Sequence, residues 1–193
     1  TRASNEAVAL GALRAGVSVV TGYPGTPSTG ALTSLLEHPQ PDTYVEWSTN
    51  EKVAFEIAAA AAWAGQRALC TMKMSGLNVA YDSLVSTAHS GVIGGLVIYV
   101  ADDPGANAGM VEQDSRGFAL MSDLPMLDPV SVQDAYDLTR FAFDLSEAIG
   151  SPVFVRLVTA NASSFSAVEF PDEPSARPER QPLLIRDIKD YTK

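Results

Sequence analysis

Short β-branched runs alternate with longer stretches of helical periodicity along the first part of the chain. Apolar residues recur at helical spacing over residues 5–15, and Gly16 follows at the kind of position where helices often end. A short strand is predicted over 17–21, and the turn-rich segment 22–28 then leads into a second helix. This order of strand, loop and helix recurs downstream.

The remaining apolar runs predict five further strands, at 44–47, 68–72, 96–100, 125–130 and 153–158. The strands 44–47 and 68–72 are followed by predicted helices, one ending at Gly65 and one over 79–88, whereas a long loop follows 96–100. The helix that ends at Ile149 opens with Ser131 and Asp134 at the spacing of a capping box. The continuous apolar run 96–100 is typical of a strand buried on both faces. The alternation predicts an α/β fold, a doubly wound parallel sheet of about six strands with helices on both faces.

The composition is that of an acidic protein with one ordinary core. Of the 193 residues 46% are hydrophobic, and 13 Lys and Arg stand against 23 Asp and Glu, for a net charge of -10. Such a charge argues against nucleic acid or an anionic membrane as the main partner. Residues 1–165 are predicted to form one domain, and 166–193, where prolines are interleaved with charges, a linker or arm.

Cys70 is the single cysteine, so this chain can build neither a disulfide framework nor a cysteine-ligated cluster. His38 and His89 lie in no spacing typical of metal ligands, and no metal site is predicted. No apolar stretch reaches the ~20 residues of a membrane span, and the first residues do not resemble an export signal. A cytoplasmic location is therefore expected.

Ligands of open parallel sheets bind outside the carboxyl ends of the strands, which directs attention to the segments that follow each strand. Four such segments carry polar or turn-forming residues: 23–28, 46–56, 74–78 and 102–116.

Two glutamates in the second segment have different interpretations. Ser48 and Glu51 have the spacing of a capping box, which predicts a structural role for Glu51 at the start of a helix. Glu56 lies among apolar residues and alanines, where an ionised carboxylate would lose much of its solvation. The alternative is that Glu56 points outward on the polar side of the helix, near Lys52.

Several motifs together resemble a known family. Glu56 is followed nine positions later by Gly65 through a helix of small residues. Further motifs are GYPGTPS at 22–28, YVEWSTNEKVA at 44–54, TMKMSGLN at 71–78, VADDPG at 100–105 and EQDSR at 112–116. In this order they resemble the pyrimidine-binding domain in the large subunit of indolepyruvate:ferredoxin oxidoreductase, a member of the 2-oxoacid:ferredoxin oxidoreductase family of thiamine-diphosphate enzymes.

The resemblance implies a catalytic glutamate. In such enzymes a glutamate hydrogen-bonds the ring nitrogen of the aminopyrimidine and favours its imino tautomer, which removes the proton from the thiazolium carbon. Glu56 is the position that the resemblance assigns to this role, as catalytic and cofactor-binding residue. A desolvated carboxylate has a raised pKa and can share a proton with a weakly basic nitrogen, which agrees with the assignment.

The resemblance also implies contacts to the cofactor and the substrate. Tyr23, Met74 and Gly76 are expected beside the cofactor, and Gly76 would let the backbone approach a flat ring closely. Thr26 is expected to bind the substrate carboxylate. From the local sequence alone, Thr26 is also predicted to cap a helix whose first residue is Pro27.

Arg116 is a candidate clamp for a carboxylate or for a coenzyme A phosphate, and it belongs to a loop longer than most in compact domains. The alternative is an ordinary surface ion pair with Asp114 or Glu112.

Parts of a thiamine-diphosphate enzyme are missing from the sequence. It contains no Gly-Asp-Gly motif, which in these enzymes helps to hold the diphosphate through Mg²⁺. The resemblance therefore implies that Mg²⁺, the diphosphate and the iron–sulfur clusters are bound by other domains or subunits. The implied reaction is oxidative decarboxylation of a 2-oxoacid such as indolepyruvate to acyl-CoA and CO2, with ferredoxin as electron acceptor.

Two other functions stay open. One is the pyrimidine-binding subunit of a non-redox 2-oxoacid decarboxylase of the sulfopyruvate type. The other is a non-catalytic module that has kept the fold.

Overall fold

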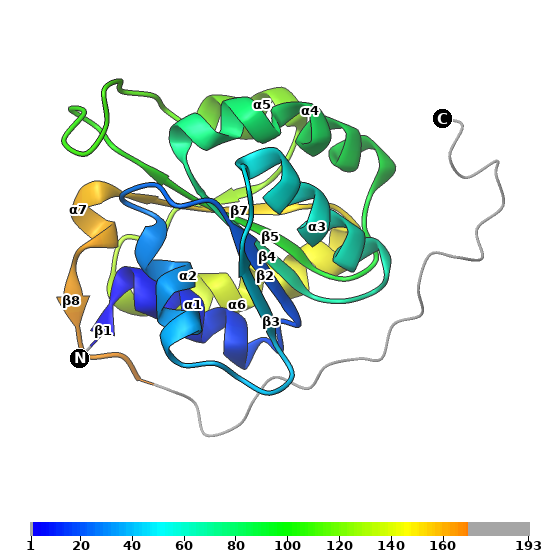
Figure 1. Cartoon of the computed structure of the whole chain (residues 1–193), viewed down its shortest axis with the longest axis horizontal. Coiled ribbons are helices and arrows are strands. Elements are labelled where there is room, and N and C mark those ends of the chain that lie inside the picture. The colour runs from blue at the N-terminus through cyan, green and yellow to red at the C-terminus, as the bar shows by residue number, and fades with distance from the viewer. Residues whose placement is uncertain (1, 170–193) are drawn as a thin grey trace, which may run out of the picture.

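The computed structural model describes residues 2–169, and a parallel sheet lies at their centre (Figure 1). Its six strands have the order β3-β2-β4-β5-β7-β6, and every neighbouring pair is parallel. The strands are β2 (Val19–Gly22), β3 (Tyr44–Trp47), β4 (Ala68–Lys73), β5 (Leu96–Asp102), β6 (Met126–Leu127) and β7 (Val153–Val158). The predicted fold class and the number of strands in this sheet are confirmed.

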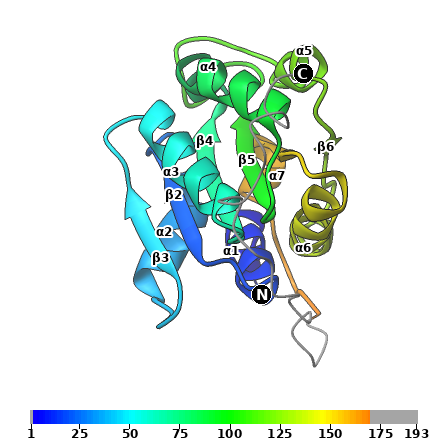
Figure 2. The same ribbon diagram turned by 90° about the vertical axis from the view of Figure 1, so that its right-hand side faces the viewer.

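Helices cover both faces of the sheet, as Figures 1 and 2 show from two directions. One face carries α1 (Ser4–Arg14), α2 (Thr29–Glu37) and α6 (Val132–Ile149). The other carries α3 (Glu51–Trp63), α4 (Met74–Ser90) and α5 (Arg116–Ser122). The short α7 (Thr159–Ala162) follows β7.

The two faces are built by alternate residues of the same strands. In β5, Val97 and Tyr99 belong to the core under α1 and α6, whereas Ile98 and Val100 belong to the core under α3 and α4. All residues of β5 are buried, because a central parallel strand is covered on both sides. The continuous apolar run seen in the sequence has this cause.

The order of the strands creates a switch point between β2 and β4. From β2 the chain passes through α2 to β3 on one side, and from β4 it passes through α4 to β5 on the other. The loops after β2 and β4 therefore leave the sheet toward opposite faces, and the crevice between them is where such folds bind ligands.

Some elements differ from the predictions. A two-stranded antiparallel ribbon of β1 (Arg2–Ala3) and β8 (Phe165–Ser166) was not predicted, because two-residue strands leave no periodicity to detect. The helix α5 also has too few turns for a clear pattern, and β6 is shorter than the predicted strand 125–130. The predicted arm lies mostly at 170–193, outside the described residues, and its prediction is untested.

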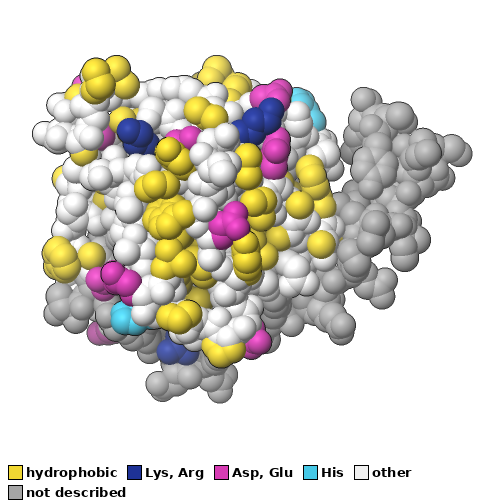
Figure 3. Space-filling model, viewed as in Figure 1, with side chains coloured by type: hydrophobic (Ala, Val, Ile, Leu, Met, Phe, Trp, Pro, Cys, Tyr) yellow, Lys and Arg dark blue, Asp and Glu magenta, His cyan; other side chains and the backbone are white. Residues whose placement is uncertain are grey.

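The surface seen in Figure 3 carries scattered Lys and Arg side chains rather than a basic patch. Apolar side chains gather across the middle of this face. Within residues 2–169, no helix combines the length and apolar character that a membrane crossing requires.

Candidate functional site

The loops that follow β2, β3 and β4 meet at the carboxyl edge of the sheet. A Cβ atom added to Gly22 would lie 2.2 Å from the Thr71 hydroxyl, and one added to Gly25 would lie 2.8 Å from Cδ of Lys73. The backbone N–H of Ser48 donates to the carbonyl of Gly22 over 2.9 Å. Glycine is required at position 22, the end of β2, because the hydroxyl and carbonyl of Thr71 in the neighbouring strand lie so close.

The loop 23–28 has its own internal bonds. The Ser28 hydroxyl donates to the Gly25 carbonyl at 2.7 Å, and the Gly25 N–H donates to the Thr29 hydroxyl at 2.9 Å. The helix α2 begins at Thr29, with Ser28 at the N-cap, so the prediction that Thr26 caps it and Pro27 opens it is wrong. Thr26 instead lies exposed in the preceding turn.

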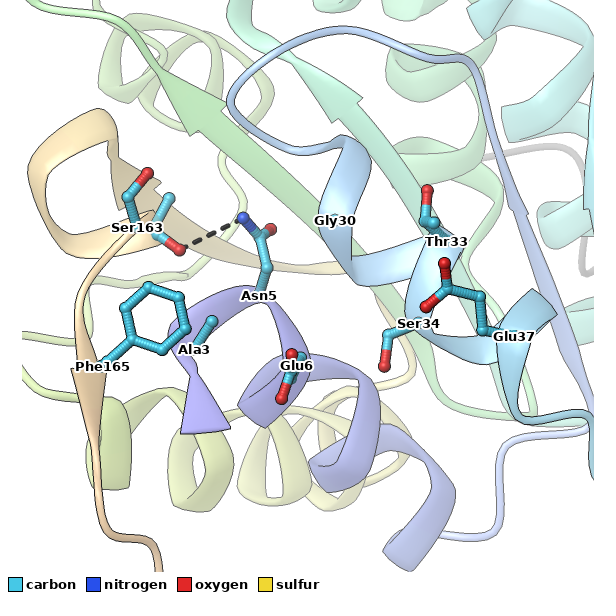
Figure 4. Close-up of a pocket in the computed structure, with 10 residues that line it drawn as sticks. Ala3, Asn5, Glu6, Gly30, Thr33, Ser34, Glu37, Ser163 and Phe165 are labelled. Carbon is cyan, nitrogen blue, oxygen red and sulfur yellow. Dashed lines mark hydrogen bonds between the residues drawn. The ribbon is translucent and has the colours of Figure 1, made fainter. Parts of the chain in front are cut away.

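Asn5 ties this loop to two other segments through its amide group. The Asn5 amide donates to the carbonyls of Pro27 (2.9 Å) and Ala162 (3.2 Å), and it accepts from the buried Tyr99 hydroxyl at 2.8 Å. Figure 4 shows Asn5 between α2 and the segment after β7, beside a cavity of about 390 Å³. The position of Thr26 therefore depends on contacts from α1, β5 and α7.

Glu51 is buried at the start of α3, with 8% of its surface exposed. The N-cap of this helix is Asn50, whose side chain accepts from the Val53 N–H at 2.9 Å. The Ser48 hydroxyl donates to Glu46 rather than capping the helix. The capping box predicted from Ser48 and Glu51 is therefore wrong, and the Glu51 carboxylate is free for another role.

The surroundings of Glu51 are close and apolar. A Cβ atom added to Gly76 would lie 2.6 Å from Cγ of Glu51 and 2.7 Å from its Oε1, so any side chain there would displace the glutamate. Burial raises the pKa of the Cys70 thiol to about 12, and the negative charge of Glu51 adds to the rise. Among residues 2–169 the Glu51 carboxylate makes neither an ion pair nor a hydrogen bond. A buried carboxylate of this kind is expected to meet a ligand.

Glu56 has the opposite environment. Its side chain is 52% exposed, accepts a 2.7 Å hydrogen bond from the Ser83 hydroxyl and lies 3.9 Å from the Lys52 ammonium. Five positions along a helix turn a side chain by about 140°, so a helix that buries Glu51 directs Glu56 away. The expectation of a desolvated Glu56 is wrong, and the outward alternative near Lys52 is confirmed. The catalytic assignment of Glu56 is left without its physical basis.

Met74 and Gly76 lie in the first turn of α4, which begins earlier than the predicted helix 79–88. Both are buried, and the Met74 carbonyl accepts from Gln113 at 3.0 Å. The Gln113 side chain also accepts from Asn78 at 2.9 Å. The long loop after β5 is thereby attached to the same edge of the sheet, next to Gly76.

Asp103 organises that loop from its other end. Its carboxylate is fully buried, accepts from the Thr159 hydroxyl at 2.7 Å and also bonds the N–H groups of Ala108 and Gly109. These hydrogen bonds, with that of Thr159 first, hold the pKa of Asp103 below its usual value. Its structural role was not predicted, although an acidic pair directly after a buried strand was a detectable signal.

Arg116 opens α5 and its side chain is 65% exposed. Its Nε donates to both oxygens of Asp114 at 2.9 Å, and this pairing lowers the pKa of Asp114 to about 2. Of the two interpretations of Arg116, the ion pair with Asp114 is the arrangement present in the structure.

The four predicted segments thus converge on one edge, around a buried carboxylate and several close backbone approaches. Within the described range 2–169, no cluster of three or more His, Cys, Asp or Glu side chains could hold a metal ion. With its doubly wound parallel sheet and these segments at the switch point, the domain belongs to the class of α/β domains that bind a cofactor or substrate at the carboxyl edge of the sheet.

Comparison with known proteins identifies the family within that class. Residues 10–184 match the family described as "Pyruvate flavodoxin/ferredoxin oxidoreductase, thiamine diP-bdg", and the chain belongs to this family. It is 44% identical over 159 residues to indolepyruvate oxidoreductase subunit IorA of Pyrococcus horikoshii, covering 82% of this chain and 24% of that protein. The IorA subunit of Archaeoglobus fulgidus is 45% identical over 170 residues, which cover 86% of this chain and 27% of that protein.

The fold is shared with a solved enzyme structure. The 2-oxoglutarate:ferredoxin oxidoreductase of Magnetococcus marinus superposes with a TM-score of 0.77 at 22% identity, covering 84% of this chain and 30% of that one. The chain thus spans about a quarter of the length of the two IorA relatives, and the other three-quarters of those relatives lie outside the matched region.

Proposed function

We propose that this chain supplies the pyrimidine-binding side of the active site of a thiamine-diphosphate-dependent 2-oxoacid:ferredoxin oxidoreductase. The substrate would be an arylpyruvate such as indolepyruvate, converted with coenzyme A to acyl-CoA and CO2 while electrons pass to ferredoxin. The family match and the names of the relatives, which are indolepyruvate oxidoreductase subunits, support this proposal. The diphosphate-binding domain or subunit would bring Mg²⁺, and the iron–sulfur clusters would also lie outside this chain.

The residues at the carboxyl edge fit an aminopyrimidine ring. The observation that carries the proposal is the buried Glu51 carboxylate, which lacks a partner within residues 2–169. Gly76 leaves open the space that a side chain would fill beside it. At the same edge of the sheet, beside Gly22, the Thr71 hydroxyl is also buried and has no hydrogen-bond partner within the same residues. We therefore assign to Glu51 the role that the sequence had suggested for Glu56.

Each residue of the site would make a distinct contribution. Thiamine diphosphate held at this edge would supply a thiazolium ring able to take up the electron pair released when the 2-oxoacid loses CO2. Glu51 would share a proton with a ring nitrogen of the aminopyrimidine, since its buried carboxylate has no other hydrogen-bond partner within residues 2–169. Met74, Gly76 and Tyr23 would line the ring, and the exposed Thr26 hydroxyl would donate to the substrate carboxylate.

Arg116 would meet the substrate carboxylate or a coenzyme A phosphate only by exchanging its contact with Asp114. Such an exchange is feasible because an exposed ion pair contributes little stability. The proposal also includes a cytoplasmic location, which agrees with the unpaired thiol of Cys70.

The test uses the complex purified with the full-length chain. We expect reduction of ferredoxin, or of a viologen dye, that requires thiamine diphosphate, coenzyme A and an arylpyruvate together. Formation of an aldehyde and CO2 without electron transfer would support the non-redox decarboxylase instead. A complex that neither binds thiamine diphosphate nor turns over 2-oxoacids would support the non-catalytic module.

A further inference from the structure

Lys73 is a cation without a counter-ion at the centre of the candidate site. It is the last residue of β4 and directly precedes α4, on the strand that borders the switch point. Within residues 2–169 its ammonium group forms no ion pair and no hydrogen bond. Arg67, Arg156 and Lys52, in contrast, form ion pairs with carboxylates.

The other cations near the edge and along α3 have carboxylate partners. Arg156 contacts Asp102 at 2.7 Å, and Lys52 contacts Asp82 at 3.1 Å. Arg116 is held by Asp114. In a protein with a net charge of -10, an unpaired lysine on a ligand-binding edge points to a negatively charged ligand.

The stem of Lys73 lies against the loop after β2. A Cβ atom on Gly25 would come within 2.8 Å of Lys73 Cδ and 2.9 Å of its Cγ, so the loop backbone and the lysine stem are in close contact. Gly25 immediately precedes Thr26, which is exposed. The lysine stem thereby lies against the turn that presents the Thr26 hydroxyl.

The start of α4 adds to the positive potential. Lys73 occupies the N-cap of this helix of 17 residues, and no side chain caps its first turn. The first N–H groups of a helix carry a partial positive charge that favours an anion. The helix start and the Lys73 ammonium group therefore both make the potential positive at this place. The carboxylate of Glu51, beside Gly76, contributes a negative charge instead.

We propose that Lys73 binds the carboxylate of the 2-oxoacid substrate, together with Thr26, and so selects 2-oxoacids over uncharged carbonyl compounds. The inference rests on the proposed function and extends it to a residue that the sequence did not single out. Lysine suits this role as a compact, mobile charge at the end of a flexible stem. A carboxylate is favoured over a phosphate because Lys73 contacts the loop of Thr26.

The test compares Lys73→Met with Lys73→Arg in the purified complex. Methionine keeps an unbranched stem against Gly25 but removes the charge, whereas arginine keeps the charge. We expect Lys73→Met to raise the KM for the 2-oxoacid roughly 10- to 100-fold, as for loss of a charged hydrogen bond. The KM for coenzyme A, the Kd for thiamine diphosphate and kcat should change little, and Lys73→Arg should recover much of the loss.

Lys52→Met is the matched control, because Lys52 is paired with Asp82 on the outer side of α3. It should leave all of these constants near the wild-type values. An unchanged 2-oxoacid KM in Lys73→Met, with the KM for coenzyme A or the Kd for thiamine diphosphate raised instead, would assign Lys73 to a phosphate and overturn the proposal.

A second measurement remains informative if Lys73→Met does not assemble. In the wild-type and Lys73→Arg complexes, the 2-oxoacid and its uncharged amide are compared as competitive inhibitors of turnover of another 2-oxoacid. A preference for the acid of less than about threefold would contradict a carboxylate-binding cation. If the wild-type complex shows no thiamine-dependent turnover, the proposed function is rejected. If turnover is normal but the Lys73 substitutions leave the KM for the 2-oxoacid unchanged, only this inference is rejected.

Discussion

Two helices of this protein begin with the same short motif and use it differently. At α6, Ser131 accepts from the Asp134 N–H at 3.0 Å, and the Asp134 carboxylate accepts from the Ser131 N–H at 3.1 Å, which completes a capping box. At α3, Ser48 and Glu51 have the same spacing but make no such bonds. One acidic residue stabilises a helix end, and the other is left for a ligand.

The difference comes from the segment before each helix. Ser48 directly follows β3, and its N–H continues the sheet by donating to the Gly22 carbonyl. A residue held in this way cannot also offer its N–H to a side chain of the helix, and the N-cap moves to Asn50. Ser131 has no such sheet bond, so its N–H is available to Asp134. A neighbouring strand can therefore release an acidic side chain from a capping role.

The largest expected effect separates the two glutamates of α3. Glu51→Gln keeps the size of the side chain but removes the carboxylate that would share a proton with the cofactor. We expect turnover of the assembled enzyme to fall by roughly 10²- to 10⁴-fold, the usual contribution of an acid–base group. Folding should survive, and proton exchange at the thiazolium carbon, followed by NMR, should slow in parallel.

Glu56→Gln is the control on the same helix. Its side chain is half exposed and bonded to Ser83, so the substitution should leave turnover near that of the wild type. If Glu56→Gln abolished proton exchange while Glu51→Gln did not, the assignment from the sequence would be right and the one from the structure wrong.

Moving the Glu51 carboxylate should have a smaller effect than removing its charge. In Gly76→Ala the new methyl group would lie 2.6 Å from Glu51 Cγ, so the side chain must shift. A displacement of about 1 Å in a catalytic group can cost roughly 10²-fold in rate. Gly117→Ala in α5 is the matched control, because a Cβ atom there meets nothing within 4 Å. Equal kcat values for the two variants would argue against a close approach at Gly76.

The fold and the location of the site were predictable because both follow from periodicity. Buried parallel strands such as β5 appear as apolar runs, and the loops after them must share one edge. The choice between Glu51 and Glu56 was not predictable in the same way. Apolar neighbours in sequence suggested that Glu56 was buried, yet in α3 only some of them, such as Phe55 and Ala59, face the core while Glu56 faces outward.

Other contacts depend on tertiary structure alone. Lys73 meets Gly25 only because β4 and β2 are neighbours, and Asn5 reaches Pro27 across the fold. No local pattern encodes such pairs. The start of α2 at Thr29 was missed for a similar reason, since Thr26 and Pro27 have good propensities for a helix start but belong to the preceding turn.

At α6 the acidic motif should affect stability and not catalysis. Ser131→Ala removes the acceptor for the Asp134 N–H, and loss of an N-cap costs about 1 kcal/mol. We expect faster amide hydrogen exchange in the first turn of α6 and a lower urea midpoint. Turnover below the unfolding range should be unchanged, and a drop in kcat at full folding would contradict a purely structural role.

The smallest effect is expected for Ser48→Ala, although Ser48 occupies the same place in its motif as Ser131. The Ser48 hydroxyl bonds only Glu46, over 3.2 Å, and Glu46 is partly exposed, so water can replace that bond. Asn50→Ala, in contrast, removes the acceptor for the Val53 N–H and should lose about 1 kcal/mol in the first turn of α3. Amide hydrogen exchange in that turn should thus become faster in Asn50→Ala and hardly change in Ser48→Ala. The reverse result would mean that Ser48 caps α3 in solution, which would return Glu51 to a structural role.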